Sequence, residues 1–538
     1  MSNDARTDSN LNQPPPFVDL DLFGTDRALR EAVAANGGGS DEDALTDFGR
    51  RWGRAEMFDL ARSADVNIPR LDGNIVIFDP AYHRFMAESM TEGLHCSTWT
   101  KEGQPACAPS EVLRAARFYM VAQVENGHMC PITMTRASVA ALATAPDLLA
   151  KVIPKISSRE YDQQFRPWQV KSAMTLGMGM TEKQGGTDVR TNTTNAVGEG
   201  DAYRVNGQKW FMSAPMSDAF LVLAQASDGL TCFFMPRYRP DGSENGLHFV
   251  NLKDKLGNRS NASSEVEFHN AYALRVGDEG RGIRTILQMV QLTRLDCAIS
   301  SAGIMRAALA RAVHHTRYRT VFQRKLADQP MMCAVLADLA LDSEAAVAVI
   351  MRLCRSFDLA RSDALEAARA RILTPVIKYW ICKTAPAFVY EAMECLGGNG
   401  YVEDYVLARL YREAPVNAIW EGSGNVMALD VLRALKGDEA RSVMESLGRE
   451  VRDLPAARET INEIVRVLNS IDVESHARFI VEHLALIAAT AALQTSAPRI
   501  AEIFSQTRLN HGGCRTYGTC NLAGASSRLL ERVLPTDK

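Results

Sequence analysis

Two glycine-rich polar segments have the composition of ligand-binding turns. One covers residues 177–188 (GMGMTEKQGGTD); the other covers residues 395–401 (CLGGNGY) and is followed by a turn at residues 420–425 (WEGSGN). Glycine lets the backbone approach a ligand closely, and the hydroxyl and backbone N–H groups of these segments can hydrogen-bond to it. Each segment alone is more often an ordinary polar turn. Because they flank a predicted β region, together they predict a flat polar cofactor held between a sheet and a helical bundle.

The common signatures of nucleotide, zinc and serine-hydrolase sites are absent from the sequence. There is no G-x-x-x-x-G-K-[ST] loop, no H-E-x-x-H helix and no G-x-S-x-G turn. The pair Gly177-x-Gly179 lacks the third glycine of a dinucleotide-binding turn. His511, Cys514 and Cys520 are irregularly spaced and have no fourth ligand nearby, so we interpret them as loop residues and predict no metal site.

The C-terminal region is locally basic, although the chain as a whole is not. Five arginines (499, 508, 515, 528 and 532) occur between residues 499 and 532 with only two glutamates, whereas the whole chain has 60 basic and 64 acidic side chains and a net charge of −4. Arginines clustered among polar residues are typical of a phosphate-contacting surface. A solvated helical face has the same composition, so both interpretations stay open.

The pattern of apolar residues predicts a helical, β, helical order along the chain. Helical periodicity dominates residues 26–150, short alternating strands occupy about 175–275, and helical periodicity returns until about 435. A chain of 538 residues exceeds a single hydrophobic core. We predict four domains: an N-terminal arm and helical domain (1–174), a β domain (175–275), a four-helix bundle (276–435) and an extra helical domain (436–538).

The composition excludes a mainly disordered chain, a collagen-like rod and a small disulfide scaffold, because 46% of the residues are hydrophobic and 23% are charged. The eleven cysteines are scattered, which fits a reducing compartment. Neither a signal peptide nor an apolar run of about 20 residues is recognisable. We therefore expect a cytoplasmic protein without a membrane segment. Residues 12–16 (NQPPP) fit either an extended arm or a frayed terminus.

Several segments, taken in order, resemble the acyl-CoA dehydrogenase family. The stretch M-T-E-x-x-G-G-T-D at residues 180–188 looks like the flavin-binding T-E-x-x-x-G-S-D segment of that family. The other matching features are residues 209–213 (KWFMS), Arg319-x-x-Phe322, Gln329, residues 396–401 (LGGNGY), Tyr411-Arg412 and residues 420–423 (WEGS). They span about residues 174–435.

A closer resemblance is to the AidB branch of this family, which is linked to the bacterial adaptive response to DNA alkylation. Its marks are residues 12–14 (NQP), 130–135 (CPITMT), 180–186 (MTEKQGG) and 254–263 (DKLGNRSNAS), together with the extra C-terminal domain. The resemblance implies a mainly α fold with a central β domain. It would comprise an N-terminal helical domain, a β-barrel or sandwich middle domain and a C-terminal four-helix bundle, with the extra helical domain added.

The resemblance also implies a reaction and a base. In the family reaction a carboxylate removes the proton α to a thioester carbonyl while a hydride passes from the β carbon to flavin N5. Glu421 matches the family's base, and the alternative base position is occupied by Thr293, which is not a carboxylate. Arg294 resembles the family's helix arginine near the substrate, although an arginine on the surface of the bundle would also fit its position.

FAD is the cofactor that the resemblance implies. Flavin and pyrophosphate contacts are assigned to Met180, Thr181, Gly186 and Thr187, to Met212 and Ser213 at the other edge of the ring, and to Trp420, Gly422, Ser423 and Asn425. Arg319 and Gln329 look like residues that reach the FAD of a neighbouring subunit, which implies a homotetramer. Two departures matter: Trp420 stands where many members have tyrosine, and Gln323 replaces the glycine that usually follows Phe322.

The leading hypothesis is an AidB-like FAD flavoprotein that binds double-stranded DNA through Arg433, Arg508, Arg515 and Arg528. It would have at most low acyl-CoA dehydrogenase activity, of the isovaleryl-CoA type. The first alternative is a metabolic acyl-CoA dehydrogenase whose extra domain serves oligomerisation or a protein partner. The second is a flavin-loaded DNA-binding scaffold without physiological turnover.

Overall fold

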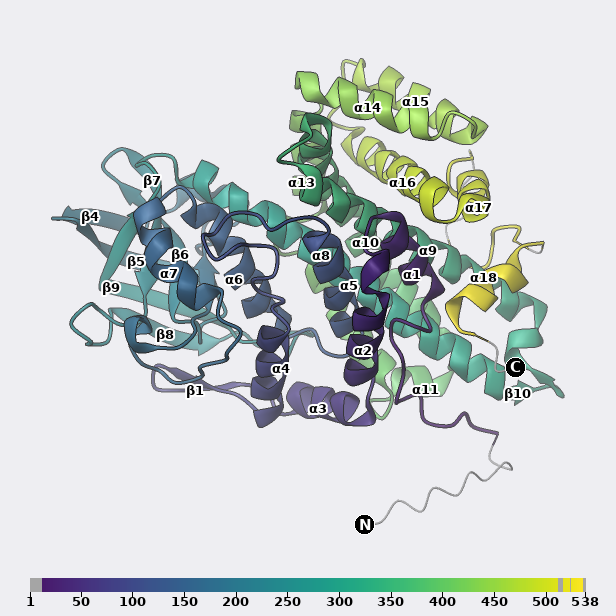
Figure 1. Cartoon of the computed structure of the whole chain (residues 1–538), viewed down its shortest axis with the longest axis horizontal. Coiled ribbons are helices and arrows are strands. Elements are labelled where there is room, and N and C mark those ends of the chain that lie inside the picture. The colour runs from purple at the N-terminus through teal and green to yellow at the C-terminus, as the bar shows by residue number, and fades with distance from the viewer. Residues whose placement is uncertain (1–11, 511–515, 523, 536–538) are drawn as a thin grey trace, which may run out of the picture. The chain divides into compact units, whose positions relative to one another are not determined.

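The computed structural model describes residues 12–510, 516–522 and 524–535 (Figure 1). The chain divides into two compact units. Unit 1 comprises residues 1–58, 115–124 and 297–538, and unit 2 comprises residues 59–114 and 125–296. These units cut across the four predicted domains, because the first helices of the chain belong with its C-terminal half. The four domain boundaries themselves stay a prediction.

A seven-stranded sheet forms the centre of unit 2. Its strands are β3 (Leu176–Gly179), β4 (Asn195–Glu199), β5 (Ala202–Ser213), β6 (Ala219–Ala226), β7 (Gly229–Pro236), β8 (Leu247–Leu252) and β9 (Ser263–Val276). The order is β3-β5-β4-β6-β7-β9-β8, with additional pairings of β3 with β6 and of β5 with β9. Alternate residues along β6, namely Phe220, Val222 and Ala224, belong to the buried core of the sheet.

The remainder of unit 2 is helical apart from a small hairpin. It contains β1 (Arg70–Asp72), β2 (Ile75–Ile77), α4 (Pro80–Thr91), α6 (Met129–Leu142) and α7 (Pro146–Ile156). Three helices have residues in both units: α3 (Ala55–Val66), α5 (Ser110–Ala122) and α8 (Gly282–Tyr318). Within unit 2, α6 packs against β3.

A buried charge network fixes the first half of α8 within unit 2. Asp296 of α8 accepts hydrogen bonds from both terminal nitrogens of Arg114 at 2.7 Å, from Arg136 at 3.2 Å and from Thr133 at 2.7 Å. Burial alone would raise the pKa of Asp296, but Arg114 and Arg136 outweigh burial and hold this pKa below its ordinary value. The network fixes the helical turn that carries Thr293 and Arg294.

Unit 1 is almost entirely helical. It contains α1 (Arg27–Ala35), α2 (Glu42–Trp52), α9 (Pro330–Leu359), α10 (Ala364–Glu394), α11 (Gly398–Tyr401), α12 (Val406–Glu413), α13 (Gly424–Ala434), α14 (Asp438–Glu450), α15 (Pro455–Leu468), α16 (Ala477–Ser496), α17 (Pro498–Arg508) and α18 (Ser526–Val533). The short hairpin of β10 (Thr320–Val321) and β11 (Arg324–Lys325) joins α8 to α9. The long helices α9 and α10 pack together, and α16 packs against both of them. The predicted mainly α fold with a central β region is confirmed.

α16 has the length and apolarity of a membrane-spanning helix. Its mean hydropathy is 1.3, and 67% of the apolar stretch is buried inside the protein. Within the described part of the chain it is the one helix with this property. Its burial is typical of the central helix of a folded domain.

Candidate functional site

In unit 2 two of the predicted cofactor residues, Met212 and Ser213, end strand β5, and two more, Met180 and Thr181, directly follow the neighbouring strand β3. Gly179 at the end of β3 pairs with Met212 of β5, and Met178 pairs with Ser213. The pairing continues past β3, because the Trp210 N–H donates to the Thr181 carbonyl at 2.8 Å. Continued in this register, Met180 and Thr181 come opposite Phe211 and Trp210, next along β5 to Met212 and Ser213.

A buried ion pair anchors the loop that follows β3. Glu182 accepts a hydrogen bond from Lys209 Nζ at 2.7 Å and from the backbone N–H groups of Thr193 and Thr194 at 2.7 and 3.2 Å. The side chains of Glu182 and Lys209 are both fully buried. Burial would raise the pKa of Glu182, but Lys209 lowers it to about 2; burial lowers the pKa of Lys209 to about 8. Sequence reasoning quoted both residues in motifs but did not foresee that they are partners.

The turn beyond Glu182 leaves room for a ligand at one glycine. A Cβ added at Gly185 would come within 2.5 Å of Thr191 Oγ1, so this position is closed by packing. At Gly186 the nearest atom to such a Cβ would be Thr181 Cγ2 at 3.5 Å, which is ordinary contact. Gly186 and Thr187 are both exposed. Their backbone and hydroxyl groups therefore fit a polar group such as the pyrophosphate of FAD.

Thr293 and Arg294 of α8, which the resemblance assigns to the alternative base position and to the substrate side, are both buried. The Thr293 hydroxyl donates to the Val290 carbonyl at 2.9 Å. This hydroxyl is therefore engaged in a hydrogen bond within α8. Arg294 is 6% exposed, which contradicts the alternative of an arginine on the surface of the bundle. Neither position supplies the catalytic carboxylate that the family resemblance implies, so Glu421 stays the predicted base.

In unit 1, Glu421, the predicted base, lies in a strained turn between α12 and α13. Glu421 has φ +59° and Gly422 has φ +107°, so two consecutive residues adopt the left-handed region that glycine favours. Lys378 of α10 is buried and donates from Nζ to the Gly422 carbonyl at 2.8 Å. A glutamate in this conformation costs about 1–2 kcal/mol, which is a feature of functional sites. Lys378, which sequence reasoning missed, fixes the turn at its strained point.

Two further contacts order the same turn. Trp420 Nε1 donates to Asn417 Oδ1 at 3.1 Å, and Arg478 Nε donates to Asn425 Oδ1 at 2.8 Å. Ser423 directly precedes the first residue of α13, so the turn ends at a helix N-terminus. Backbone N–H groups there favour an anion or a polar acceptor. Contacts from three elements of unit 1 thus hold the turn that contains Trp420, Gly422, Ser423 and Asn425.

Three family models match successive parts of the chain. They are the N-terminal domain of the adaptive response protein AidB at residues 12–163, the acyl-CoA dehydrogenase middle domain at 177–271 and the acyl-CoA dehydrogenase C-terminal domain at 280–436. The putative acyl-CoA dehydrogenase AidB of Escherichia coli is 43% identical to the chain and covers 95% of it, with 96% of the relative matched. The chain belongs to the acyl-CoA dehydrogenase family.

Further similarities agree with this membership. Acyl-CoA dehydrogenase family member 11 of Caenorhabditis elegans is 32% identical over 78% of the chain and 70% of the relative. The crystal structure of Caenorhabditis elegans ACDH-11 in complex with C11-CoA has a TM-score of 0.84 at 26% identity, covering 94% of this chain and 93% of that one. The predicted family and its fold are confirmed, and the family uses FAD.

The acyl-CoA dehydrogenase motif around Arg319 lies on the β10–β11 hairpin. Gln329 Nε2 donates to the Val321 carbonyl at 3.2 Å, so the two ends of this connection are tied together. Phe322 and Gln323 form its tip with φ +50° and +64°, and Phe322 is 90% exposed. Gln323 thus adopts a left-handed backbone conformation that glycine favours. Whether this hairpin contacts phosphate stays a prediction.

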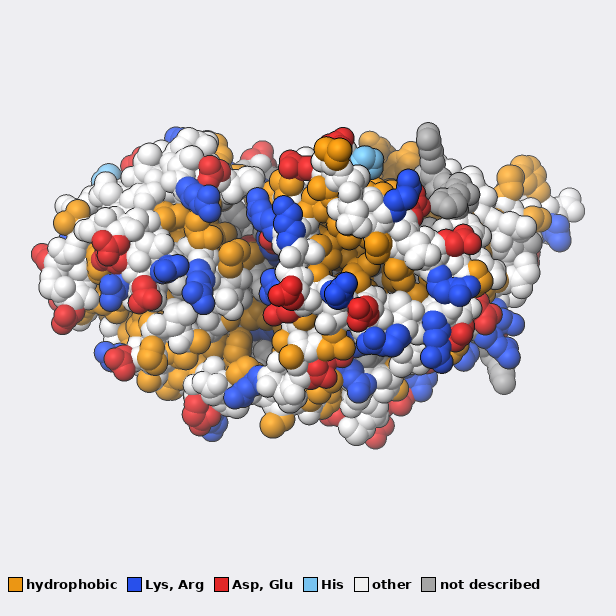
Figure 2. All heavy atoms as spheres, turned by 90° about the horizontal axis from the view of Figure 1, so that it is seen from above, with side chains coloured by type: hydrophobic (Ala, Val, Ile, Leu, Met, Phe, Trp, Pro, Cys, Tyr) orange, Lys and Arg blue, Asp and Glu red, His pale blue; other side chains and the backbone are white. Residues whose placement is uncertain are grey.

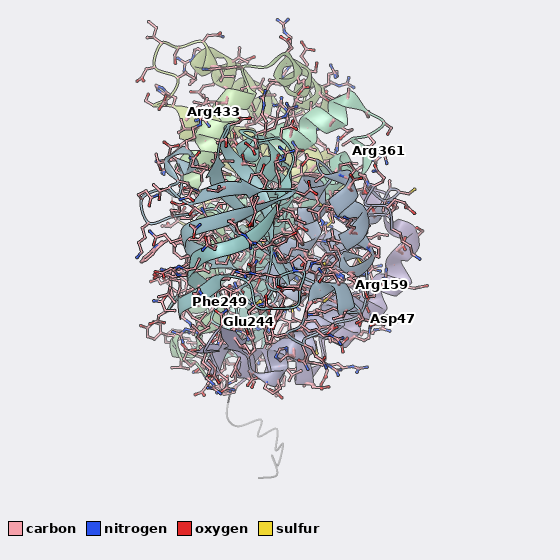
Figure 3. The ribbon with its side chains drawn as sticks, turned by 90° about the vertical axis from the view of Figure 1, so that its left-hand side faces the viewer. Asp47, Arg159, Glu244, Phe249, Arg361 and Arg433 are labelled. Atoms are coloured by element: carbon pink, nitrogen blue, oxygen red, sulfur yellow. The ribbon has the colours of Figure 1, made fainter. Side chains whose placement is uncertain are left out.

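The predicted DNA-binding arginines differ in their surroundings. Arg433, in the last turn of α13, and Arg528, on α18, are exposed (Figure 3 labels Arg433). Arg508 donates from Nε to Asp342 at 2.8 Å and also pairs with Asp338, and these carboxylates raise its pKa although burial would lower it. Its charge is therefore already neutralised within unit 1. Arg515 lies outside the described residues, as do His511 and Cys514.

Proposed function

We propose that this protein is an FAD-dependent acyl-CoA dehydrogenase in which Glu421 is the catalytic base. The Glu421 carboxylate takes the proton from the α carbon of an acyl thioester as the C–H electron pair becomes the Cα=Cβ bond. FAD, when bound, supplies the acceptor for the hydride that leaves the β carbon. The observation that carries this proposal is the turn at Glu421, which has a strained backbone and is anchored by Lys378. A solvated glutamate without a function would not require a strained, anchored backbone.

Each unit contributes groups of the kind this chemistry needs. Unit 2 offers the exposed Gly186 and Thr187 for a pyrophosphate, together with Met212 and Ser213 at the end of β5, paired with β3. The buried Glu182–Lys209 pair holds that loop in one arrangement before the cofactor binds, which reduces the entropy lost on binding. In unit 1, Lys378 keeps the Glu421 turn in one conformation. We further propose a cytoplasmic homotetramer, by analogy with the family.

The decisive experiment combines flavin content with one substitution. Purified protein, or protein incubated with FAD, is expected to show a flavin absorbance band and to be bleached by an acyl-CoA such as isovaleryl-CoA. Glu421→Gln keeps the flavin band and loses the bleaching by at least about 100-fold. Glu439→Gln, a substitution of an exposed glutamate on α14, is the matched control. Full bleaching of Glu421→Gln would show that another group is the base.

We also propose that the protein binds double-stranded DNA as part of an alkylation response, like the AidB branch that it resembles. The exposed Arg433 and Arg528 support this role. On the face shown in Figure 2, basic and acidic side chains are interspersed, so contacts on that face would come from single arginines and not from one broad basic field. In that case binding depends on a small number of phosphate contacts.

Salt dependence tests the DNA proposal. Affinity for duplex DNA is expected to fall steeply with salt, and an Arg433→Ala, Arg528→Ala double variant should reduce the log–log slope by about 2. Arg361→Ala removes an exposed arginine that is not among the predicted DNA contacts and serves as the control (Figure 3). Binding that is absent, or equally weakened in both variants, would favour the metabolic alternative without DNA binding.

A further inference from the structure

Residues 12–17 form an ordered arm that docks on the connection between α8 and α9. The Asn12 side chain donates from Nδ2 to the Thr320 carbonyl at 2.7 Å and accepts from the Thr320 N–H at 2.8 Å. One side-chain amide therefore satisfies both backbone groups of the first residue of β10, as a partner strand would. Asn12 has φ +50°, a conformation that asparagine adopts more readily than most residues.

The same residue also orients Arg319. Its backbone carbonyl accepts a hydrogen bond from Arg319 Nη1 at 2.9 Å. Among the residues that the structure describes, Arg319 forms no ion pair. A neutral carbonyl directs a guanidinium without cancelling its charge, so the cation stays available for a phosphate, which it can bind with parallel N–H groups.

The rest of the arm is held along unit 1. The Pro15 carbonyl lies 2.9 Å from His314 Nε2, and the ring of Phe17 lies 4.5 Å from the His314 ring. Gln13 Oε1 accepts from Asn399 Nδ2 at 3.4 Å. The arm therefore contacts α8, the β10–β11 hairpin and the glycine-rich segment at α11. The alternative of a frayed terminus at these residues is wrong.

The glycine-rich segment that the arm reaches is open. Gly397 has φ +61°, and a Cβ added at either Gly397 or Gly398 would meet no atom within 4 Å. An unfilled glycine turn of this kind lets a ligand approach the backbone. The arm thus connects Arg319, a cation without an acidic partner among the described residues, to an open glycine turn, and both belong to segments that match the acyl-CoA dehydrogenase family.

We propose that the arm is a positioning strap for the adenylate end of FAD, with Asn12 as its key residue. By pairing with Thr320 and directing Arg319, Asn12 holds the hairpin in the conformation that receives the pyrophosphate. Asn12 acts through Arg319 and is not a catalytic residue. The inference rests on the proposed function, since it requires that FAD binds.

The test compares Asn12→Ala with wild type and with Asn462→Ala, a substitution of an exposed asparagine on α15. Apoprotein is titrated with FAD and, in parallel, with FMN, which lacks the adenylate. Asn12→Ala is expected to weaken FAD binding about tenfold and to leave FMN binding unchanged, because the lost hydrogen bonds act on the adenylate side only. Asn12→Gly, which keeps the left-handed backbone, is expected to show the same loss.

Hydrogen exchange of the apoprotein gives a readout that does not depend on flavin. Amides in residues 318–329 should exchange faster in Asn12→Ala than in Asn462→Ala. A wild-type protein that takes up no FAD overturns both the proposed function and this inference. If wild type binds FAD and Asn12→Ala binds it equally well, or loses FAD and FMN affinity in the same proportion, the strap alone is refuted.

Discussion

Arg508 is expected to stabilise the fold and not to bind DNA, and its removal tests this directly. The side chain is 14% exposed and pairs with Asp338 and Asp342, which are 2% and 9% exposed. The two carboxylates also accept from the Gly518 N–H at 2.8 Å and from the Tyr517 hydroxyl at 3.0 Å. Arg508 thus connects the end of α17, the segment after it and α9.

Arg508→Ala leaves two buried carboxylates close together without a cation. Breaking a buried pair from one side typically costs 3–5 kcal/mol, so we expect a loss of about that size in the free energy of unfolding of unit 1. Burial already raises the pKa of Asp338, and removing Arg508 takes away the group that opposes this rise. The Asp338 carboxyl of the variant therefore ionises at higher pH in the folded state than in the unfolded state. The penalty should be small near pH 4 and larger at pH 7.

Urea unfolding at pH 4 and pH 7, followed by circular dichroism, measures this difference. An Arg508→Ala, Asp338→Asn, Asp342→Asn variant is the control, because it removes the uncompensated charges and should recover part of the loss at pH 7. DNA affinity of the folded Arg508→Ala protein should equal that of wild type. Wild-type stability combined with reduced DNA affinity would refute the structural role and restore Arg508 as a DNA contact.

Three further predictions concern the buried polar groups. Lys378→Met should lower the rate of flavin bleaching by an acyl-CoA about tenfold or more while FAD affinity stays unchanged; an unaltered rate would show that the Glu421 turn holds without it. Asp296→Ala should lower the free energy of unfolding of unit 2 by about 3–5 kcal/mol, measured by urea titration, because Arg114 and Arg136 lose their shared acceptor. The pKa of Glu182 is lowered to about 2 in the folded state. The difference in unfolding free energy between wild type and Glu182→Gln should therefore reach its full size above about pH 4.5 and shrink as the pH falls toward 2. A difference independent of pH would contradict this.

The order of elements was predictable because it depends on local patterns. Alternating apolar and polar residues along β9, such as Val266, Glu267 and Phe268, and the periodicity of α9 are visible in short windows of sequence. Glu421 was predicted as the base for a related reason, since its neighbours Trp420, Gly422 and Ser423 form a contiguous motif. The left-handed conformation of Glu421 was not foreseen, because an isolated glutamate gives no sign of a positive φ.

The partners of charged groups were not predictable, because they are distant in sequence. Lys378 is 44 residues from Gly422, and Asn12 is 308 residues from Thr320. A lysine in a helix or an asparagine near the start of the chain has many possible neighbours. Only the folded chain shows that each of them reaches the backbone of a motif residue.

The C-terminal arginines show how partners that are distant in sequence affect a functional prediction. Counting them suggested one basic surface, but Arg508 and Arg532 are both paired with buried acids of α9, Arg532 with Glu344 at 2.8 Å. Two of the charges in that count thus hold the extra helices to the bundle. A DNA surface built from the remaining exposed arginines has fewer phosphate contacts, so its affinity should depend less steeply on salt than the arginine count implies. A measured slope that requires more contacts than these would mean that residues outside the described part of the chain, such as Arg515, take part in binding.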